Sequence, residues 1–238
     1  AIPAWASFDG TTFSGTPDYI NAGDTLVVFD ATDGIEVVQH TVNINVPDHF
    51  GDVSEDGALS SFDAAMILQY SVHLPVSPFN VIIADVTGVS GVTAYDAALV
   101  LRKVVDPGYV FPVFGETPTK PAVSTPRSLA FYDTDAGWEL RVNDPTGIIA
   151  GDLIVELPDE SAATVSGTNV AYRQDGRMLA ISFARLVEGD SNLLTIASSG
   201  TSAPLLASVM LNEGSIPVGS VLPTEFALHQ NTPNPFNP

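Results

Sequence analysis

Alternating apolar and polar positions mark the start of the chain as β-structure. Residues 25–29 and 37–46 are rich in β-branched and aromatic residues, and the segment HTVNINV shows alternation. Period-two alternation places the apolar side chains on one face of a sheet, so these two segments are predicted to be strands.

A longer β-pattern occupies residues 127–212, where short apolar segments are separated by turns that carry Gly, Pro, Asp or Ser. Seven strands in about 85 residues predict an antiparallel sandwich. The predicted strands are Ser128 to Tyr132, Trp138 to Val142, Asp152 to Leu157, Asn169 to Tyr172, Arg177 to Phe183, Asn192 to Ala197 and Leu205 to Leu211.

Between these β-regions lies a duplicated pattern. Residues 52–63 read DVSEDGALSSFD and residues 85–96 read DVTGVSGVTAYD, so the two copies start 33 residues apart. Each copy leads into an apolar helical pattern, DAAMILQYSV in the first and DAALVLRKVV in the second. The chain is therefore predicted to be mainly β and multi-domain, with a small all-α calcium-loop unit between β-sandwiches.

The first copy has the spacing of a calcium-binding loop. A 12-residue calcium loop supplies hard oxygen ligands from positions 1, 3, 5, 7, 9 and 12, and a Gly at position 6 allows a sharp turn. Gly57 stands at position 6. The candidate ligands are Asp52, Ser54, Asp56, the carbonyl of Ala58, Ser60 and Asp63.

The second copy departs from this pattern at two positions. Val89 at position 5 has no side-chain oxygen, and Ser90 replaces the Gly at position 6. Because this loop holds only two carboxylates, we expect it to bind calcium weakly or not at all. Its candidate ligands are Asp85, Thr87, the carbonyl of Gly91, Thr93 and Asp96.

Composition and charge narrow the range of functions that the chain can have. The net charge is −20 with only eight basic residues, which argues against nucleic-acid binding and against anionic membranes. There is no Cys, so disulfides and thiolate sites are excluded. No apolar run reaches the roughly 18 residues that a membrane span requires, and Ala1 follows no basic signal-peptide region.

Catalytic patterns were not found. The four histidines, His40, His49, His73 and His229, are scattered, and no G-x-S-x-G or phosphate-binding Gly-rich loop occurs. We therefore expect no enzymatic activity in these residues.

The duplicated loop and helix resemble a dockerin over Gly51 to Val105. Dockerins are extracellular modules that bind cohesin domains, and loop positions 10 and 11 often set their choice of partner. The matching residues here are Ser61, Phe62, Ala94 and Tyr95. The resemblance implies a calcium-dependent protein partner for this surface, although the two aromatic residues can instead pack between the repeats.

Three further resemblances complete the predicted domain order. Residues 1–47 resemble the C-terminal half of a cadherin-like or immunoglobulin-like domain, and residues 127–218 resemble a cohesin-like sandwich with Leu157-Pro158-Asp159 at a characteristic turn. Residues 219–238 resemble the start of a type IX secretion sorting domain, which implies the surface of a Gram-negative bacterium. The cadherin-like matches are Pro3, Trp5, Phe8, Thr12 to Pro17 and Ala31 to Asp33, and the sorting-domain matches are Pro223, Phe226, Leu228, Gln230, Asn231 and Pro233 to Pro238.

The dockerin-like unit is predicted over residues 48–106 and a Pro-rich linker over 107–126. The predicted function is calcium-stabilised protein–protein attachment in a secreted protein. Head-to-tail contacts between chains would give a fibre or scaffold, whereas packing within one chain would give the stalk of a secreted enzyme or adhesin. A third alternative is carbohydrate binding by the sandwich, with Trp138 and Tyr172 as candidate residues.

Overall fold

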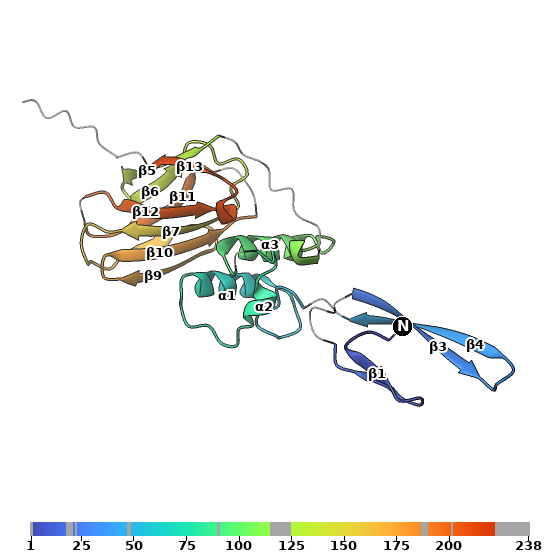
Figure 1. Cartoon of the computed structure of the whole chain (residues 1–238). Coiled ribbons are helices and arrows are strands. Elements are labelled where there is room, and N and C mark those ends of the chain that lie inside the picture. The colour runs from blue at the N-terminus through green and yellow to red at the C-terminus, as the bar shows by residue number, and fades with distance from the viewer. Residues whose placement is uncertain are drawn as a thin grey trace, which may run out of the picture.

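A computed structural model describes residues 2–17, 21, 23–46, 49–89, 91–114, 125–186, 190–200 and 202–221. In these residues the protein is mainly β, with several antiparallel sheets and three α-helices. Figure 1 shows the order along the molecule: two hairpins, then the helices, then a two-sheet sandwich. The predicted mainly β class is confirmed at this level.

The hairpins occupy the N-terminal region. β1 (Ala6–Phe8) pairs with β2 (Phe13–Gly15), and β3 (Gly23–Thr32) pairs with β4 (Val37–Val46). The two strands predicted in this region are confirmed as β3 and β4. Phe29 makes edge-to-face contacts with Phe8 and Phe13, with ring centroids 5.4 and 5.6 Å apart.

The helical unit is built from the duplicated segment. α1 (Ser61–Ser71) and α3 (Ala94–Val105) pack against each other, and a short α2 (Val81–Ala84) precedes the second loop. Each long helix starts with a capping box, in which a hydroxyl residue and the acid three positions later satisfy the free amides of the first turn. Those pairs are Ser60 with Asp63 and Thr93 with Asp96.

The helical unit extends further than predicted. Residues 107–114 were expected to belong to the linker, but Phe111 is fully buried in the helical core. The N–H of Val113 donates to the carbonyl of Val86, and Phe114, at the end of the 3₁₀ turn η2 (Pro112–Phe114), contacts Phe50 edge to face. The linker interpretation was wrong here because three apolar rings in this stretch outweigh its prolines. Residues 115–124 of the linker lie outside the described residues.

The sandwich has a five-stranded and a four-stranded sheet. The first sheet has the order β13-β5-β6-β11-β8, with bounds Val218–Val221, Arg127–Thr134, Gly137–Val142, Asn192–Ala197 and Thr164–Ser166. The second has the order β12-β7-β10-β9, with bounds Leu205–Leu211, Ala150–Glu156, Met178–Ala184 and Val170–Asp175.

One buried core joins these two sheets, with Leu129 and Leu140 on the first and Leu153 and Ile181 on the second. The seven predicted strands are present. β8 and β13 were not predicted, and β13 pairs in parallel with β5, so the sandwich is not purely antiparallel.

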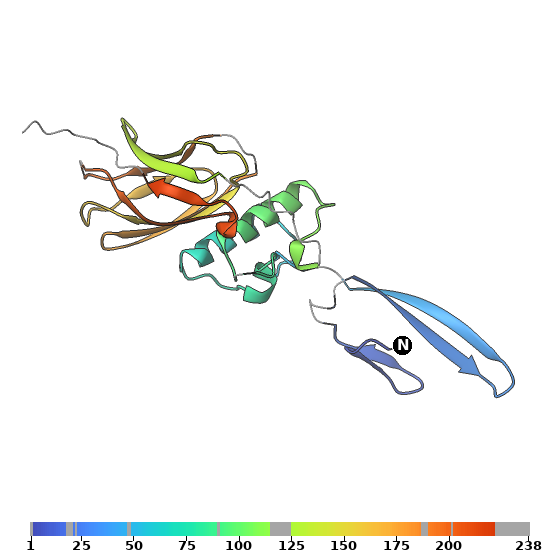
Figure 2. The same ribbon diagram turned by 45° about the horizontal axis from the view of Figure 1, so that its top comes forward.

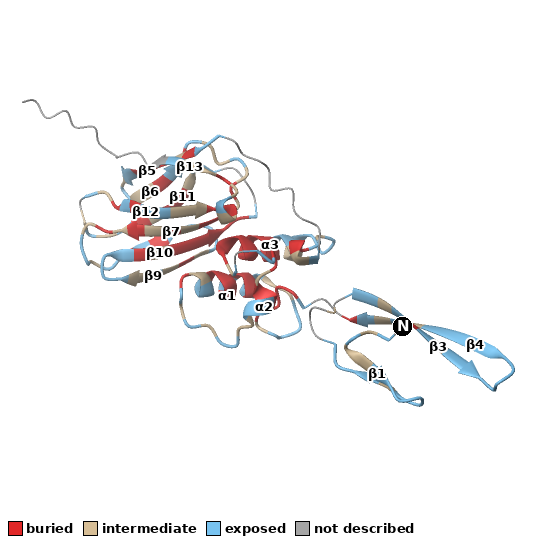
Figure 3. Cartoon of the chain, viewed as in Figure 1, coloured by how far each residue is buried: buried red, intermediate tan, exposed pale blue. Residues whose placement is uncertain are grey.

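The helices pack against one end of the outer face of the four-stranded sheet, and Figure 2 shows the helical unit beside this end of the sandwich. Ala150, Ala171 and Ala184 on this face belong to the same buried cluster as the helical residues. In Figure 3 much of α1, α3 and the neighbouring β10 is coloured as buried. α3 contacts β7 and β10, and α1 contacts β9 and β10. These alanines have small side chains, so the apolar residues of α1 and α3 can pack directly against the sheet.

Candidate metal centre and the helix–sandwich joint

The first loop folds around the carboxylate of Asp52. One oxygen of this carboxylate accepts hydrogen bonds from the Ser54 hydroxyl and the Asp56 amide, both at 3.3 Å, and the other accepts from the Gly57 amide at 2.9 Å. Gly57 has φ +86°, in the left-handed region that favours glycine. The loop therefore turns back on its first residue, as a calcium loop does.

Asp63 closes the same loop from the helix side. Its carboxylate is fully buried and accepts from the Ser54 amide at 3.1 Å, the Ser60 amide at 2.9 Å and the Ser60 hydroxyl at 3.0 Å. The structure thus brings together loop positions 1, 3, 9 and 12. The Asp56 carboxylate accepts from the Ala58 amide at 2.9 Å, and both residues are exposed.

A cavity of about 330 Å³ opens beside this loop. Asp52, Glu55 and Gly57 line it from the loop, and Asn80 lines it from the residue before α2. The opening gives an ion from solvent a route to the Asp52 carboxylate.

The second loop repeats this arrangement. The Asp85 carboxylate accepts from the Thr87 hydroxyl at 3.0 Å and the Gly88 amide at 2.7 Å. Asp96 is fully buried and accepts from the amides of Thr87 and Thr93 at 3.1 and 2.9 Å. Burial raises the pKa of Asp96 to about 7, with added repulsion from the charges of Glu213 and Asp85.

Two other residues of the second loop, Gly91 and Val89, match the predicted ligand pattern less directly. Gly91, the predicted carbonyl ligand, has φ +77° and supplies a turn. The backbone carbonyl of Val89 accepts from the Thr87 hydroxyl at 3.1 Å. Ser90 lies outside the described residues.

The donor set of both loops consists of carboxylates, hydroxyls and carbonyls. Hard oxygen donors suit Ca²⁺ and do not suit metals that prefer nitrogen or sulfur. In the described residues no three His, Asp or Glu side chains form a ready-made metal cluster. The carboxylates accept hydrogen bonds from the amides and hydroxyls of their own loops. A carboxylate has about four lone-pair sites, so it can contact a bound ion as well.

Glu213 is a residue of this site that the sequence did not reveal. It lies in the 3₁₀ turn η3 (Asn212–Gly214) after β12, 120 residues away from Thr93 along the chain. Its Oε1 atom lies 3.2 Å from the Thr87 hydroxyl and 2.9 Å from the Thr93 hydroxyl. No motif surrounds Glu213, and so only the packed structure connects it with the second loop.

The four predicted partner-binding residues have different environments. Ser61 and Phe62 are exposed, and 61% of Phe62 is accessible. Ala94 and Tyr95 are buried, at 0% and 6%, in the cluster that includes the sandwich alanines. Ala94 and Tyr95 are therefore not free for a partner from another chain in this structure, because they are buried in the cluster that the helices share with the sandwich. Burial also raises the pKa of Tyr95 to about 12.

The candidate carbohydrate residues do not form one platform. Trp138 on β6 and Tyr172 on β9 belong to different sheets, and both are half-buried against the sandwich core. His40, His49 and His73 belong to β4, to the start of the first loop and to the end of α1, so the described histidines do not share a site. His229 lies outside the described residues.

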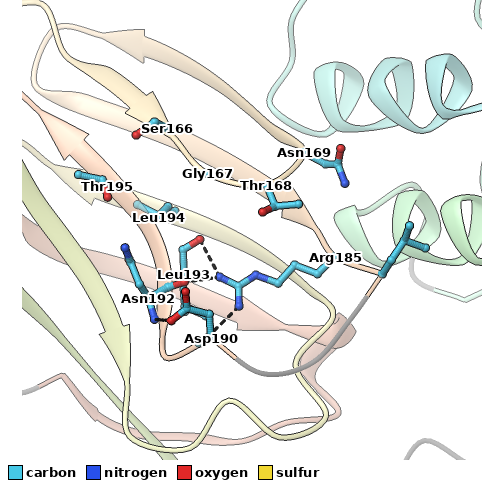
Figure 4. A pocket seen from close by; sticks show the side chains of 11 residues that line it. Ser166, Gly167, Thr168, Asn169, Arg185, Asp190, Asn192, Leu193, Leu194 and Thr195 are labelled. Carbon is cyan, nitrogen blue, oxygen red and sulfur yellow. Dashed lines mark hydrogen bonds between the residues drawn. The ribbon is translucent and has the colours of Figure 1, made fainter. Parts of the chain in front are cut away.

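A second cavity, of about 390 Å³, lies at one end of the sandwich (Figure 4). The Arg185 guanidinium beside it donates to the backbone carbonyls of Asp190, Asn192 and Leu193 at 3.0, 2.6 and 2.9 Å. These contacts tie β10 to the start of β11. Arg185 therefore has a structural role in this cavity.

The chain matches no family model, no curated protein and no solved structure. In the described residues no helix is long and apolar enough to cross a membrane.

Proposed function

We propose that this chain is a non-catalytic, calcium-stabilised structural segment of a secreted bacterial surface protein. In this proposal a dockerin-like helical unit clamps onto a cohesin-like sandwich of the same chain. The observation that carries the proposal is the shared core of α1, α3 and the outer alanines of the sandwich. It favours the stalk over the fibre among the two arrangements that the sequence left open.

Calcium contributes stability to this unit in the proposal. A folded loop binds the ion and an unfolded loop does not, so the ion shifts the equilibrium towards the folded state. The carboxylates of Asp52 and Asp63 are buried or nearly so. An ion at this position would compensate for the cost of burying their charges.

The remaining parts keep their proposed identities. The hairpins would belong to a cadherin-like domain, and the C-terminal segment to a type IX sorting signal. Residues 219–221 of that segment belong to β13 of the sandwich, and residues 222–238 lie outside the described residues. Together they describe a multi-domain stalk on the outer surface of a Gram-negative bacterium.

Sedimentation velocity in millimolar calcium, repeated after chelation, tests the proposal. We expect a monomer in both conditions, because the helical unit already occupies a sandwich of its own chain. Assemblies that dissolve on chelation would contradict it and would make calcium the joint of a fibre.

A second candidate function is attachment of a partner through the first repeat. Phe62 is 61% exposed, whereas Tyr95 at the equivalent position of the second repeat is 6% exposed. An exposed aromatic residue is a typical anchor for a protein partner. A cohesin-like sandwich from a second copy of the chain is the partner that fits this repeat.

Sedimentation equilibrium over a range of protein concentrations tests this candidate. If this candidate holds, the wild type self-associates weakly at high concentration, Phe62→Ser abolishes the association and Leu26→Ser does not, since Leu26 is similarly exposed, at 65%, but lies in the hairpin strand β3. Identical behaviour of the two variants would show that Phe62 is not the anchor for a partner.

A further inference from the structure

The structure assigns Glu213 a role in the second calcium loop. We propose that its carboxylate replaces the ligand that Val89 cannot provide at position 5, so that an ion bound there joins the helical unit to the sandwich. The inference rests on the calcium chemistry of the proposed function and adds a ligand from outside the loop.

The first argument is the position of the Glu213 carboxylate. Its Oε1 atom lies 3.2 Å from the Thr87 hydroxyl and 2.9 Å from the Thr93 hydroxyl, which are loop positions 3 and 9. Oxygens that share a calcium ion at about 2.3–2.6 Å lie roughly 3 Å from one another. Glu213 therefore stands at the distance of a neighbouring ligand from two candidate ligands.

The second argument is a shortage of protons between these oxygens. The Thr87 hydroxyl lies within 3.2 Å of Asp85 Oδ1, the Val89 carbonyl and Glu213 Oε1. The Thr93 hydroxyl lies within 3.1 Å of Asp96 Oδ2 and Glu213 Oε1. A hydroxyl has one proton to donate, so the two hydroxyls supply two protons for five short oxygen contacts, and the other three contacts need a further proton or a cation.

Such contacts bring the lone pairs of oxygen atoms together, and three of the six atoms belong to carboxyl groups. A cation relieves this repulsion because it interacts favourably with every oxygen around it. The first loop has no comparable excess: the Ser54 hydroxyl donates to Asp52 and the Ser60 hydroxyl to Asp63. The surplus of acceptors arises where the sandwich meets the second loop.

The third argument is that the sandwich holds Glu213 in place. Asn212 is buried, and its side-chain oxygen accepts from the amides of Ile149 and Ala150 at 3.0 and 2.9 Å. Its side-chain amide donates to the carbonyl of Gly147 at 2.6 Å. Asn212 and Glu213 have φ +44° and +52°, a region that costs energy for residues with a side chain. Rigid contacts within the sandwich thus direct Glu213 at the loop.

With Glu213 included, both loops have the same number of carboxylates. The first has Asp52, Asp56 and Asp63, and the second has Asp85, Asp96 and Glu213. The expectation of a weak second site considered the loop alone. Ion binding and docking are then linked, because the fifth side-chain ligand, Glu213, is present only when the sandwich is docked.

Isothermal titration of the full chain with calcium tests the inference. We expect two bound ions in the wild type. Glu213→Gln should weaken one of them at least tenfold, and Asp52→Asn should remove the other. Glu160→Gln, a matched change at an exposed turn of the sandwich, should alter neither.

Hydrogen exchange gives a second readout. Calcium should slow the exchange of residues 149–152 and of the first turn of α3 in the wild type, and this effect of calcium should vanish in Glu213→Gln. Equal loss of protection with and without calcium would assign Glu213 a calcium-independent hydrogen bond and overturn the inference.

The two proposals fail in different ways. A wild type that binds one ion, lost in Asp52→Asn and kept in Glu213→Gln, overturns the inference and leaves the proposed function standing. A chain that binds no calcium overturns both.

Discussion

The hydroxyl of Ser182 on β10 donates a 2.6 Å hydrogen bond to one oxygen of Asp152 on β7. The other oxygen of Asp152 accepts from the Ala94 amide at 3.2 Å, at the first residue of α3. The first amides of a helix have no partner within the helix, and a carboxylate there also interacts favourably with the helix dipole. A pair of sandwich side chains thus completes the start of a helix in the neighbouring unit.

This contact gives a pH prediction. Burial raises the pKa of Asp152, with the Ser182 and Ala94 hydrogen bonds acting in the opposite direction. A carboxyl whose pKa is raised on folding contributes stability that is complete below its unfolded value near 3.8 and is lost as pH rises through the folded value. The wild type should therefore gain stability relative to Asp152→Asn as pH falls towards 4.

Thermal unfolding of both proteins in chelator at a series of pH values measures this difference. Parallel pH profiles of the two proteins would contradict the raised pKa. Asp175→Asn, at an exposed strand end of the same sheet, is the matched control.

Ala184→Glu should release the helical unit from the sandwich. Ala184 is fully buried in the shared cluster, and burying an unpaired carboxylate costs well above the roughly 1–3 kcal/mol of a neutral polar group. Small-angle scattering should show a larger radius of gyration. Ala207→Glu, at an exposed position of β12 in the same sheet, should leave the radius unchanged, and a similar change in both variants would argue against the joint.

Asp52→Ala should lower the melting temperature in calcium and change it little after chelation. Binding at a hundredfold excess over Kd stabilises by about 2.7 kcal/mol, which corresponds to roughly 5–10 °C for a chain of this size. Asp135→Ala in an exposed turn controls for the loss of charge. Equal losses with and without calcium would mean that Asp52 has only a structural role.

Phe111→Ala should destabilise the helical unit by about 3–5 kcal/mol, the usual cost of removing a fully buried ring. Val110→Ala, which changes a residue that is 44% exposed, should cost far less. Urea unfolding followed by helical circular dichroism separates the two variants. Equal stabilities of the two variants would mean that residues 107–114 belong to the linker and not to the helical core.

Local pattern was enough to predict the strands with clear alternation and both capped helices. In β10 the residues Leu179, Ile181 and Phe183 face the core, and in the α1 loop Ser60 and Asp63 form the capping pair that their spacing implies. These elements depend on neighbours within a few positions, and sequence records such neighbours directly.

The joint could not be predicted in the same way, because its members are far apart in the chain. Glu213 belongs to the joint because it contacts Thr87 and Thr93, which lie 126 and 120 positions away along the chain. A weak signal did exist in β10, whose outward positions Ala180, Ser182 and Ala184 are small rather than charged. Such a strand indicates a sheet face that another element covers.

The unequal environments of Phe62 and Tyr95 determine how many equivalent faces the two repeats can offer to a partner. Two repeats of similar sequence, if both were exposed, would offer an approaching partner two similar faces and hence two alternative ways to bind. Here the face of the second repeat, with Tyr95, is buried in the cluster that the helices share with the sandwich, and the face of the first repeat, with Phe62, is exposed. A duplicated sequence thus leaves one of its two equivalent aromatic positions exposed, and a partner that used this position would bind in a single orientation relative to the sandwich.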